Sequence, residues 1–120
     1  MGLKAAVCKQ DELTPGNMVG THVGPVPVVV IRTPDGELHG LVDKCLHQGG
    51  TLSKGKLTGL YDARPGAVGE YEVRREGEIL RCPWHGFEYD VRTGATLFDA
   101  TRCLRKVTVW EEEGIVMAEM

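Results

Sequence analysis

Two short clusters in this 120-residue chain each combine a cysteine with a histidine, and both residue types can bind a metal. Cys45 and His47 form the first cluster, Cys82 and His85 form the second, and residues 48–81 separate them. A structural zinc site of this composition usually pairs its cysteines in one cluster and its histidines in another. A two-iron centre with mixed ligands instead binds one iron through two cysteines and the other through two histidines. One thiol and one imidazole in each cluster therefore favour a two-iron centre, and zinc stays an alternative.

The residues beside the four candidate ligands suit an inorganic cluster close to a surface. The neighbours that we expect around it are Gln48, Gly49, Gly50, Pro83, Trp84 and Gly86. The glycines leave room for backbone N–H groups to approach bridging sulfides, the proline stiffens the second loop, and the indole limits the access of solvent. Hydrogen bonds and burial of this kind set the reduction potential of a metal centre.

The segments that must position these loops have the composition of short β-strands. Four strand pairs are predicted across turn residues: 26–32 with 37–42, 71–75 with 78–81, 87–91 with 95–98, and 104–110 with 115–118. No segment keeps a helical period beyond a turn or two, and 16 glycines divide the chain into short elements. We therefore expect an all-β antiparallel barrel or sandwich in a single domain. Each ligand cluster follows a predicted strand, so two neighbouring strand ends could bring the loops together.

Composition and charge exclude several kinds of partner. A formal net charge of −3 leaves no basic footprint for nucleic acid. The longest apolar run, Val26 to Ile31, is interrupted by Pro27 and is far too short to cross a bilayer. The first residues lack the features of a secretory leader. We expect a cytoplasmic monomer with no membrane or nucleic-acid partner, in which the acidic run 111–113 is a solvated turn or helps to steer a basic partner.

Together with their flanks, the two clusters resemble the two motifs of the Rieske [2Fe–2S] family. The first motif is Cys45-Leu46-His47-Gln48-Gly49-Gly50, and the second is Cys82-Pro83-Trp84-His85-Gly86-Phe87-Glu88-Tyr89-Asp90. The resemblance implies a Rieske-type antiparallel β fold, with a base formed by about 1–43 and 91–120 and a cluster-binding part formed by about 44–90. It also implies one [2Fe–2S] cluster per chain, whose metal ligands are Cys45, His47, Cys82 and His85. The two imidazoles would be exposed at the tip where a redox partner docks.

Three positions indicate which branch of this family the chain is similar to. Respiratory and photosynthetic members carry an extra cysteine in each loop, where this chain has Gly50 and Trp84, and a serine where it has Phe87. The disulfide across the cluster and one hydrogen-bond donor to sulfide are then missing, and Tyr89 remains as a donor toward a cysteine sulfur. Fewer donors predict a potential toward the low end of the Rieske range of about −150 to +300 mV.

A low potential is typical of the free ferredoxins of this family. The resemblance thus implies a soluble one-electron carrier, without a catalytic site of its own, that passes electrons from a flavoprotein reductase to a terminal oxygenase. Three alternatives stay open. The chain could be a redox subunit like the small subunit of nitrite reductase, a zinc-stabilised binding module, or the Rieske domain of a larger oxygenase.

Residues outside the motifs have simpler expected roles. The span between the clusters is about twice that of most relatives, and we expect the excess to form an extended loop over about 54–69. This loop could be a flap that shapes partner choice or a solvated extension. Cys8 and Cys103 are expected to be small buried thiols. His22 and His39 are expected to be solvated or locally bonded.

Overall fold

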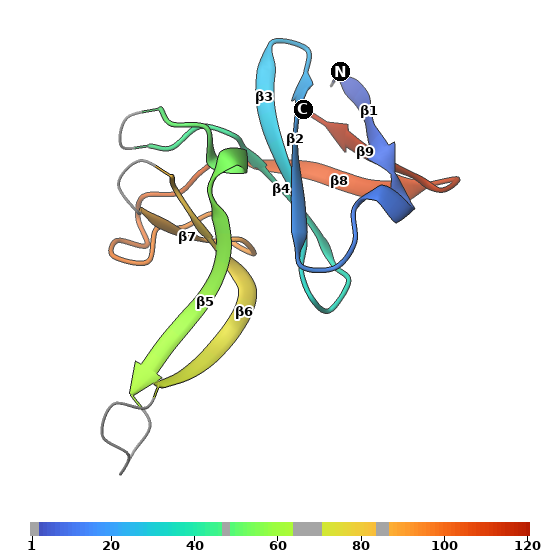
Figure 1. Cartoon of the computed structure of the whole chain (residues 1–120). Helices are drawn as coiled ribbons and strands as arrows, with labels where there is room; N and C mark the ends of the chain where they lie inside the picture. The colour runs from blue at the N-terminus through green and yellow to red at the C-terminus, as the bar shows by residue number, and fades with distance from the viewer. Residues whose placement is uncertain (1–2, 47–48, 64–70, 84–86) are drawn as a thin grey trace.

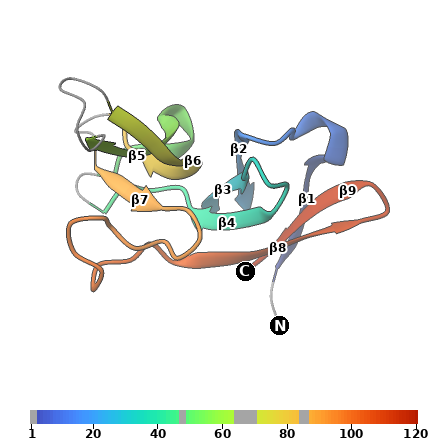
Figure 2. The same cartoon turned by 90° about the horizontal axis from the view of Figure 1, so that it is seen from below.

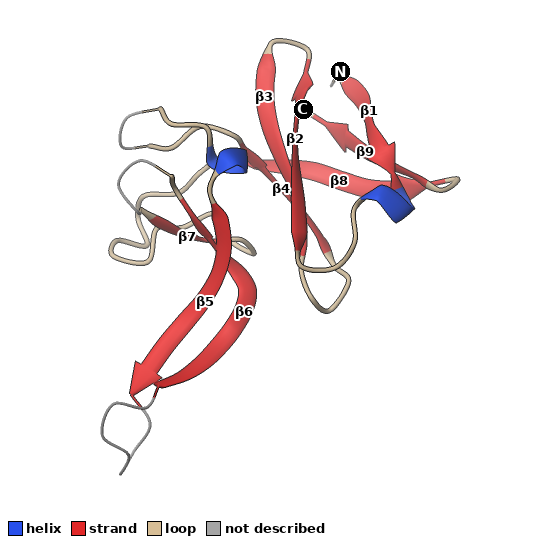
Figure 3. Cartoon of the chain, in the orientation of Figure 1, coloured by secondary structure: helices blue, strands red, loops and turns tan. Residues whose placement is uncertain are grey.

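Nine strands and two short 3-10 helices make up the described part of the chain (Figure 1). The computed structural model describes residues 3–46, 49–63, 71–83 and 87–120. The elements in chain order are β1 (Lys4–Lys9), η1 (Gln10–Glu12), β2 (Asn17–Val23), β3 (Val26–Arg32), β4 (Leu38–Val42), η2 (Leu52–Lys54), β5 (Lys56–Ala63), β6 (Tyr71–Arg81), β7 (Glu88–Asp90), β8 (Lys106–Glu112) and β9 (Ile115–Glu119). Strands dominate this part of the chain (Figure 3), so the expected all-β fold is confirmed.

Two antiparallel sheets divide the fold. The larger sheet has the order β1-β9-β8-β4-β3-β2 and is nearly closed, like a barrel, whereas the smaller sheet holds β5, β6 and β7. The smaller sheet lies at the end of the molecule away from β1 and β9 in both views (Figures 1 and 2). No helix in the described ranges is long and apolar enough to cross a membrane.

Strand β3 joins the barrel to the smaller sheet. Its side chains point alternately to opposite faces of the sheet, because successive residues of a strand face opposite ways. Val28 and Val30 pack in the core of the barrel, whereas Val29 and Ile31 pack in a second core that also contains Cys45. All four β3 side chains are fully buried. Burial on both faces explains why this segment is a continuous apolar run rather than an alternating one.

Two of the predicted hairpins form as expected. In the turn between β3 and β4, Gly36 has a φ of +90° and donates its N–H to the Thr33 carbonyl at 2.8 Å. In the turn between β8 and β9, Glu113 and Gly114 have φ values of +50° and +79°. Positive φ at both central residues is the requirement of the tightest hairpin turn, and glycine meets it at little cost.

The third predicted pair, 87–91 with 95–98, forms only in part. Strand β7 pairs mainly with β6, and a single bridge joins Tyr89 to Thr96. Strands β1 and β2 were not predicted, because alanine, cysteine and glycine weaken their strand signal.

The predicted hairpin at Glu76-Gly77 is wrong. Residues on both sides of it belong to one strand, β6, whose partner is β5. Residues 75–78 bulge out of this ladder opposite the single residue Gly59. Arg75 and Gly77 have φ values of +53° and +77° in the bulge. A bulge and a hairpin turn both use positive φ, so the local signal could not distinguish them.

The expected extended loop over about 54–69 is also corrected. Its first half is strand β5, and residues 64–70 lie outside the described residues. Strand β5 and the outer half of β6 form a two-stranded ribbon that leaves the body of the molecule (Figure 1).

Four expectations outside the motifs have mixed outcomes. Cys103 is exposed and Cys8 only half-buried, so the expectation of two buried thiols is wrong for Cys103. His22 is exposed, as expected. The imidazole of His39 is largely buried instead of solvated, and its Nε2 lies 3.4 Å from Oε2 of Glu37 without hydrogen-bond geometry. Burial lowers the pKa of His39.

Candidate metal centre

The first cysteine lies in a loop that leaves β4 and ends at η2. Cys45 is 3% exposed; its N–H donates to the Gly50 carbonyl at 2.8 Å, and its carbonyl accepts the Gly49 N–H at 2.9 Å. Gly49 has a φ of +71°, a conformation that glycine adopts readily, so the chain can turn tightly around the thiol. Two of the glycines predicted around the centre therefore shape this loop.

A buried carboxylate closes the base of the same loop. Asp43 is 5% exposed and accepts hydrogen bonds from the Ser53 N–H at 2.7 Å and from the Ser53 hydroxyl at 2.5 Å. Gly20 on β2 packs against this pair so closely that a Cβ there would lie 2.5 Å from the Ser53 Oγ. Sequence reasoning missed Asp43 and Ser53, because neither belongs to a ligand motif and only closure of the loop brings them together.

The second cysteine follows β6 directly. Cys82 is 4% exposed, and its N–H donates to the Phe87 carbonyl at 2.8 Å, which closes the second loop. The Phe87 ring packs edge-on against Phe98, with ring centres 5.1 Å apart. Phe98 is 60% exposed, so this aromatic pair forms a wall of the site that solvent reaches.

Tyr89 connects the second loop to the first. It is fully buried on β7, its hydroxyl accepts the Leu46 N–H at 3.0 Å, and this oxygen lies 3.2 Å from Sγ of Cys45. Burial raises the pKa of the phenol, and the contact with Cys45 raises it further. The hydroxyl therefore keeps its proton and can donate it to the cysteine sulfur. This geometry fits the donor role expected for Tyr89.

Both cysteines belong to one buried core, which also contains Tyr89. The structure thus brings together the two thiols, the phenol and two loop glycines, with Pro83 exposed beside them. Five of the predicted site residues lie outside the described residues: His47, Gln48, Trp84, His85 and Gly86.

An ionic network fastens the smaller sheet to the turn between β3 and β4. Arg92 donates to Glu78 Oε1 at 2.8 Å, to Asp35 Oδ2 at 2.8 Å and to Glu37 Oε2 at 2.7 Å. The Arg92 hydrogen bond is the main reason why the pKa of Glu78 is lowered. Arg92 therefore links the carboxylate of Glu78 in the smaller sheet to the carboxylates of Asp35 and Glu37 in the turn between β3 and β4.

A second arginine extends this network from the bulge of β6. Arg75 donates to Glu78 Oε1 at 3.2 Å and to Asp90 Oδ1 at 2.9 Å. Asp90 follows Tyr89 on β7, so the arginine holds the strand that carries the phenol. Sequence reasoning assigned neither arginine a role: Arg75 lies among the charged residues of β6, and Arg92 lies in the turn after β7.

Comparison with known proteins assigns the family. Residues 4–111 match the family model of the Rieske [2Fe-2S] domain. Apoptosis-inducing factor 3 of Homo sapiens is 33% identical over 92 residues, which are 77% of this chain and 12% of that protein. The ferredoxin component of biphenyl 2,3-dioxygenase from Rhodococcus jostii (strain RHA1) is 28% identical over 88 residues, which are 73% of this chain and 64% of that protein. The chain thus spans less than two thirds of each of these relatives.

Solved structures share the fold over nearly the whole chain. One chain in the complex of reduced oxygenase and oxidized ferredoxin in carbazole 1,9a-dioxygenase superposes with a TM-score of 0.72 at 25% identity. The match covers 97% of this chain and 92% of that chain. Chains described as nitrite reductase small subunits share the fold alone, at 18% and 19% identity.

The fold and the site define a small antiparallel β protein in which two buried cysteines from different loops share one core. The chain belongs to the Rieske [2Fe–2S] domain family. Its cofactor is a Rieske-type [2Fe–2S] cluster. The described residues fit this group, because two buried thiols and a protonated hydroxyl beside one of the sulfurs suit the cysteine-bound iron.

Proposed function

We propose that Cys45, His47, Cys82 and His85 are the four ligands of the cluster. The burial of both thiols in one core supports this assignment, since they leave different strands and meet 37 positions apart. A histidine follows each cysteine by two or three positions. Two thiolates on one iron and two imidazoles on the other complete the set that a mixed-ligand two-iron cluster needs.

We further propose that the protein carries single electrons from a flavoprotein reductase to a terminal oxygenase. The observation that carries this proposal is a buried cysteine pair beside exposed residues: Cys45 and Cys82 are 3% and 4% exposed, whereas their neighbours Leu46 and Pro83 are exposed. A cluster bound by these thiols would lie close to the surface. It could therefore exchange electrons with a docked protein, and no substrate pocket is needed for that. The likeness to the ferredoxin component of biphenyl dioxygenase supports the kind of partner.

The bound cluster supplies reversible one-electron chemistry, and the residues around it set the potential at which this occurs. Tyr89 donates a hydrogen bond to the Cys45 sulfur, which stabilises the more negative reduced state. Phe87 lies where the high-potential branch of the family has a hydroxyl, and its ring cannot donate. The potential of this chain should therefore lie toward the low end of the family's range.

Metal analysis and spectroscopy test the ligand assignment. Purified protein should contain two irons and two acid-labile sulfides per chain, and dithionite reduction should give the EPR signal of a mixed-ligand cluster. The variant His85→Cys should change or abolish this signal. Colourless protein with one zinc per chain would overturn the assignment in favour of the zinc-binding module.

Electrochemistry and reconstitution test the carrier role. We expect a midpoint potential below zero and NADH-driven oxygenase turnover that requires this protein, a flavoprotein reductase and a terminal oxygenase together. A potential well above zero would contradict the carrier role and leave the ligand assignment intact. Oxygenase turnover that proceeds equally well without this protein would also contradict the carrier role.

A further inference from the structure

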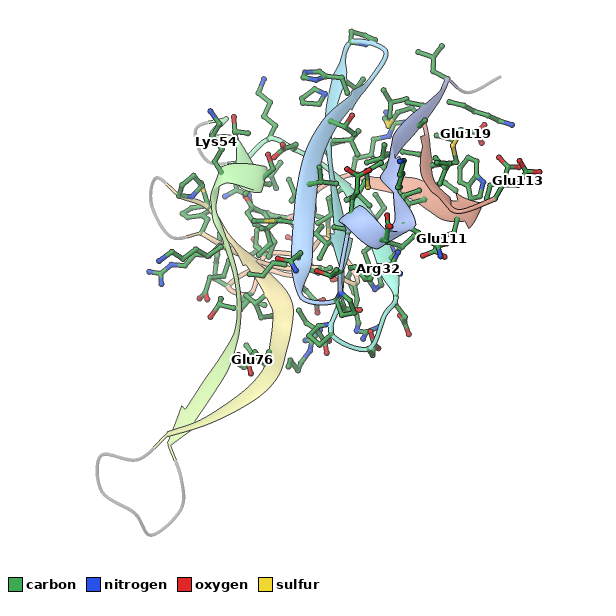
Figure 4. All side chains as sticks on the ribbon, turned by 45° about the vertical axis from the view of Figure 1, so that its right-hand side comes forward. Arg32, Lys54, Glu76, Glu111, Glu113 and Glu119 are labelled. Carbon is green, nitrogen blue, oxygen red and sulfur yellow. The ribbon has the colours of Figure 1, made fainter. Side chains whose placement is uncertain are left out.

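Exposed cations surround the two cysteine loops. They are Lys44, Lys54, Lys56, Arg81 and Arg105. Two of them directly precede the cysteines, and another, at the end of η2, lies on the side of the cluster loops (Figure 4). Lys56 pairs with Arg81 across β5 and β6, and Arg105 lines the same groove as Cys45. None of the five forms an ion pair with any carboxylate in the described ranges.

Exposed carboxylates gather at the opposite end of the molecule. Glu111, Glu112 and Glu113 lie at the turn between β8 and β9, and Asp11 and Glu12 lie on η1. A backbone hydrogen bond of 2.8 Å from η1 to this turn joins the two groups. Figure 4 shows Glu111 and Glu113 on the far side of the molecule from Lys54.

Three carboxylates near the cysteine loops are buried or half-buried. Asp43 is buried and occupied by two hydrogen bonds from Ser53. Asp99 is half-buried and accepts hydrogen bonds from the N–H and hydroxyl of Thr101, and Glu88 is half-buried on β7. The cluster end is therefore locally basic although the whole chain carries −3.

Exposed apolar side chains lie beside both cysteine loops. Leu46 is 40% exposed beside the first cysteine, and Phe98 is 60% exposed on the wall of the second loop. A groove of about 720 Å³ with a mainly apolar lining runs from Cys45 and Leu46 to Leu104, with Lys44 and Arg105 at its side. An apolar centre inside a charged rim is the usual composition of a protein-docking surface.

We propose that this surface, with Leu46 and Phe98 at its centre and Lys44, Lys54 and Arg105 on its rim, docks an acidic face of the redox partner. The proposal rests on the carrier role and adds the charge that the partner must present. Charge complementarity identifies the occupant as a protein surface with carboxylates around an apolar centre, because the rim carries cations with no described counter-charge.

The separation of charge also orients the encounter. A partner with an acidic face is attracted to the cluster end and repelled by the carboxylates of the β8–β9 turn. That turn was expected to be solvated or to steer a basic partner. Its position far from the cluster favours a different role, which is to repel acidic surfaces from the unproductive end.

Inorganic oxidants of opposite charge test the local field without knowledge of the partner. Dithionite first reduces the holoprotein by one electron, and each reduced protein then gives that electron to one Co(III), which becomes Co(II). With the tris(oxalato)cobaltate(III) trianion, the rate constant should fall as salt is added from about 10 mM, where the screening length is about 30 Å. With the tris(ethylenediamine)cobalt(III) trication, it should rise or stay constant.

Two lysine variants with the same net charge provide the matched control. Lys54→Glu places the change beside the cluster, and Lys9→Glu places it at the acidic end, where Lys9 is exposed. At low salt, Lys54→Glu should slow oxidation by the trianion at least about threefold, and Lys9→Glu should slow it by less than half that factor. Equal effects of the two variants, or a trianion rate in the wild type that rises with salt, would overturn the proposal.

An equilibrium measurement separates binding from electron transfer. Hexacyanochromate(III), a paramagnetic trianion that does not oxidise the protein, should broaden the amide NMR signals of Lys56 and Arg105 in the oxidised holoprotein. The signals of Glu112 and Gly114 should stay sharp, and broadening at both ends alike would contradict the proposal. Failure of the carrier role would appear in the reconstitution assay and leave these charge responses unchanged.

Discussion

The hydroxyl of Tyr89, on the strand that follows the second cysteine loop, makes two contacts with the first loop. It accepts the Leu46 N–H and lies within hydrogen-bond distance of the Cys45 sulfur, while its ring is fully buried on β7. A buried donor with a raised pKa keeps its proton over the whole physiological range, so its effect on the sulfur does not change with pH. A residue of the second motif thus acts on the cysteine sulfur of the first.

Removal of this hydroxyl should lower the reduction potential. Tyr89→Phe deletes a hydrogen bond worth about 1 kcal/mol to the reduced state, which corresponds to a potential about 40 mV lower for a one-electron couple. Protein-film voltammetry measures the shift. Thr108→Val, which removes an exposed hydroxyl on β8, is the control and should leave the potential unchanged. An unchanged potential in Tyr89→Phe would show that the hydroxyl does not donate to the sulfur.

Element η2 and strand β6 approach each other at the point where a side chain cannot fit. Gly55 follows η2, and a Cβ at this position would lie 1.9 Å from the carbonyl oxygen of Arg81 and 3.1 Å from that of Leu52. Both obstacles are backbone atoms, so no side-chain rotation relieves the clash. The first cysteine loop and the strand that leads to the second cysteine can therefore approach this closely only because Gly55 has no side chain.

Gly55→Ala should therefore destabilise the protein by about 3 kcal/mol, the upper end of the usual range for overpacking. Urea denaturation of the holoprotein measures the loss in the free energy of unfolding. Gly16→Ala is the matched control: Gly16 has a φ of +83°, but a Cβ there would meet no atom within 4 Å, so only backbone strain of about 1 kcal/mol is expected. Equal losses in the two variants would contradict the close approach.

The network around Arg92 is the other connection between elements, and its pH dependence can be predicted. Hydrogen bonds from Thr33 and then from Arg92 lower the pKa of Asp35 from 3.8 to about 2, and Arg92 lowers that of Glu78. A carboxyl whose pKa is lowered by folding stabilises the folded state above its unfolded pKa, and this stability is lost as pH falls through the folded value.

Arg92→Gln should accordingly lower the free energy of unfolding near pH 6, and its difference from the wild type should shrink as the pH falls from about 4 toward about 2. Denaturation at a series of pH values checks this trend. Arg102→Gln removes an exposed arginine without a described ion pair. Its charge is only the last of the causes that lower the pKa of Asp99, so its trend should be much smaller. A constant difference for Arg92→Gln would mean that the network does not contribute through its charges.

At the scale of the molecule, the described residues form a barrel, a smaller sheet and a ribbon that extends from this sheet, and the site lies where the barrel and the smaller sheet meet. The site packs against the inner part of the smaller sheet, where Leu57 and Leu80 contact the core of the cysteines. Beyond the bulge opposite Gly59, β5 and β6 pair with each other and not with β7. The outer ribbon should therefore be separable from the metal centre.

Deletion of residues 60–74 tests this separation. It leaves a five-residue connection between the paired residues Thr58 and Ile79, a length that hairpins commonly use, and it keeps Arg75. We expect a folded protein with unchanged iron content and an unchanged EPR signal. Loss of the cluster in this variant, with the far-ultraviolet circular dichroism preserved, would show that the ribbon helps to hold the site.

Features that depend on local chemistry could be predicted from the order of the residues. One thiol and one imidazole in each cluster predicted the kind of cofactor, and Thr33–Gly36 predicted a hairpin because glycine accepts the positive φ that the turn requires. The same local rule failed at Glu76-Gly77, where the positive φ belongs to a bulge and the choice was made by the partner strand β5.

Features that depend on register and packing could not be predicted in this way, because they require segments far apart in the chain to meet. Cys45 and Tyr89 are 44 positions apart, and their contact exists because β7 pairs with β6 beside the first loop. The carboxylate of Asp43 meets Ser53 only when that loop closes. The acidic run 111–113 is visible along the chain, but its distance from the cations near the cysteines is not, since the fold alone sorts the two groups to opposite ends. A ligand set is a property of residue types, whereas a docking surface is a property of their arrangement in space.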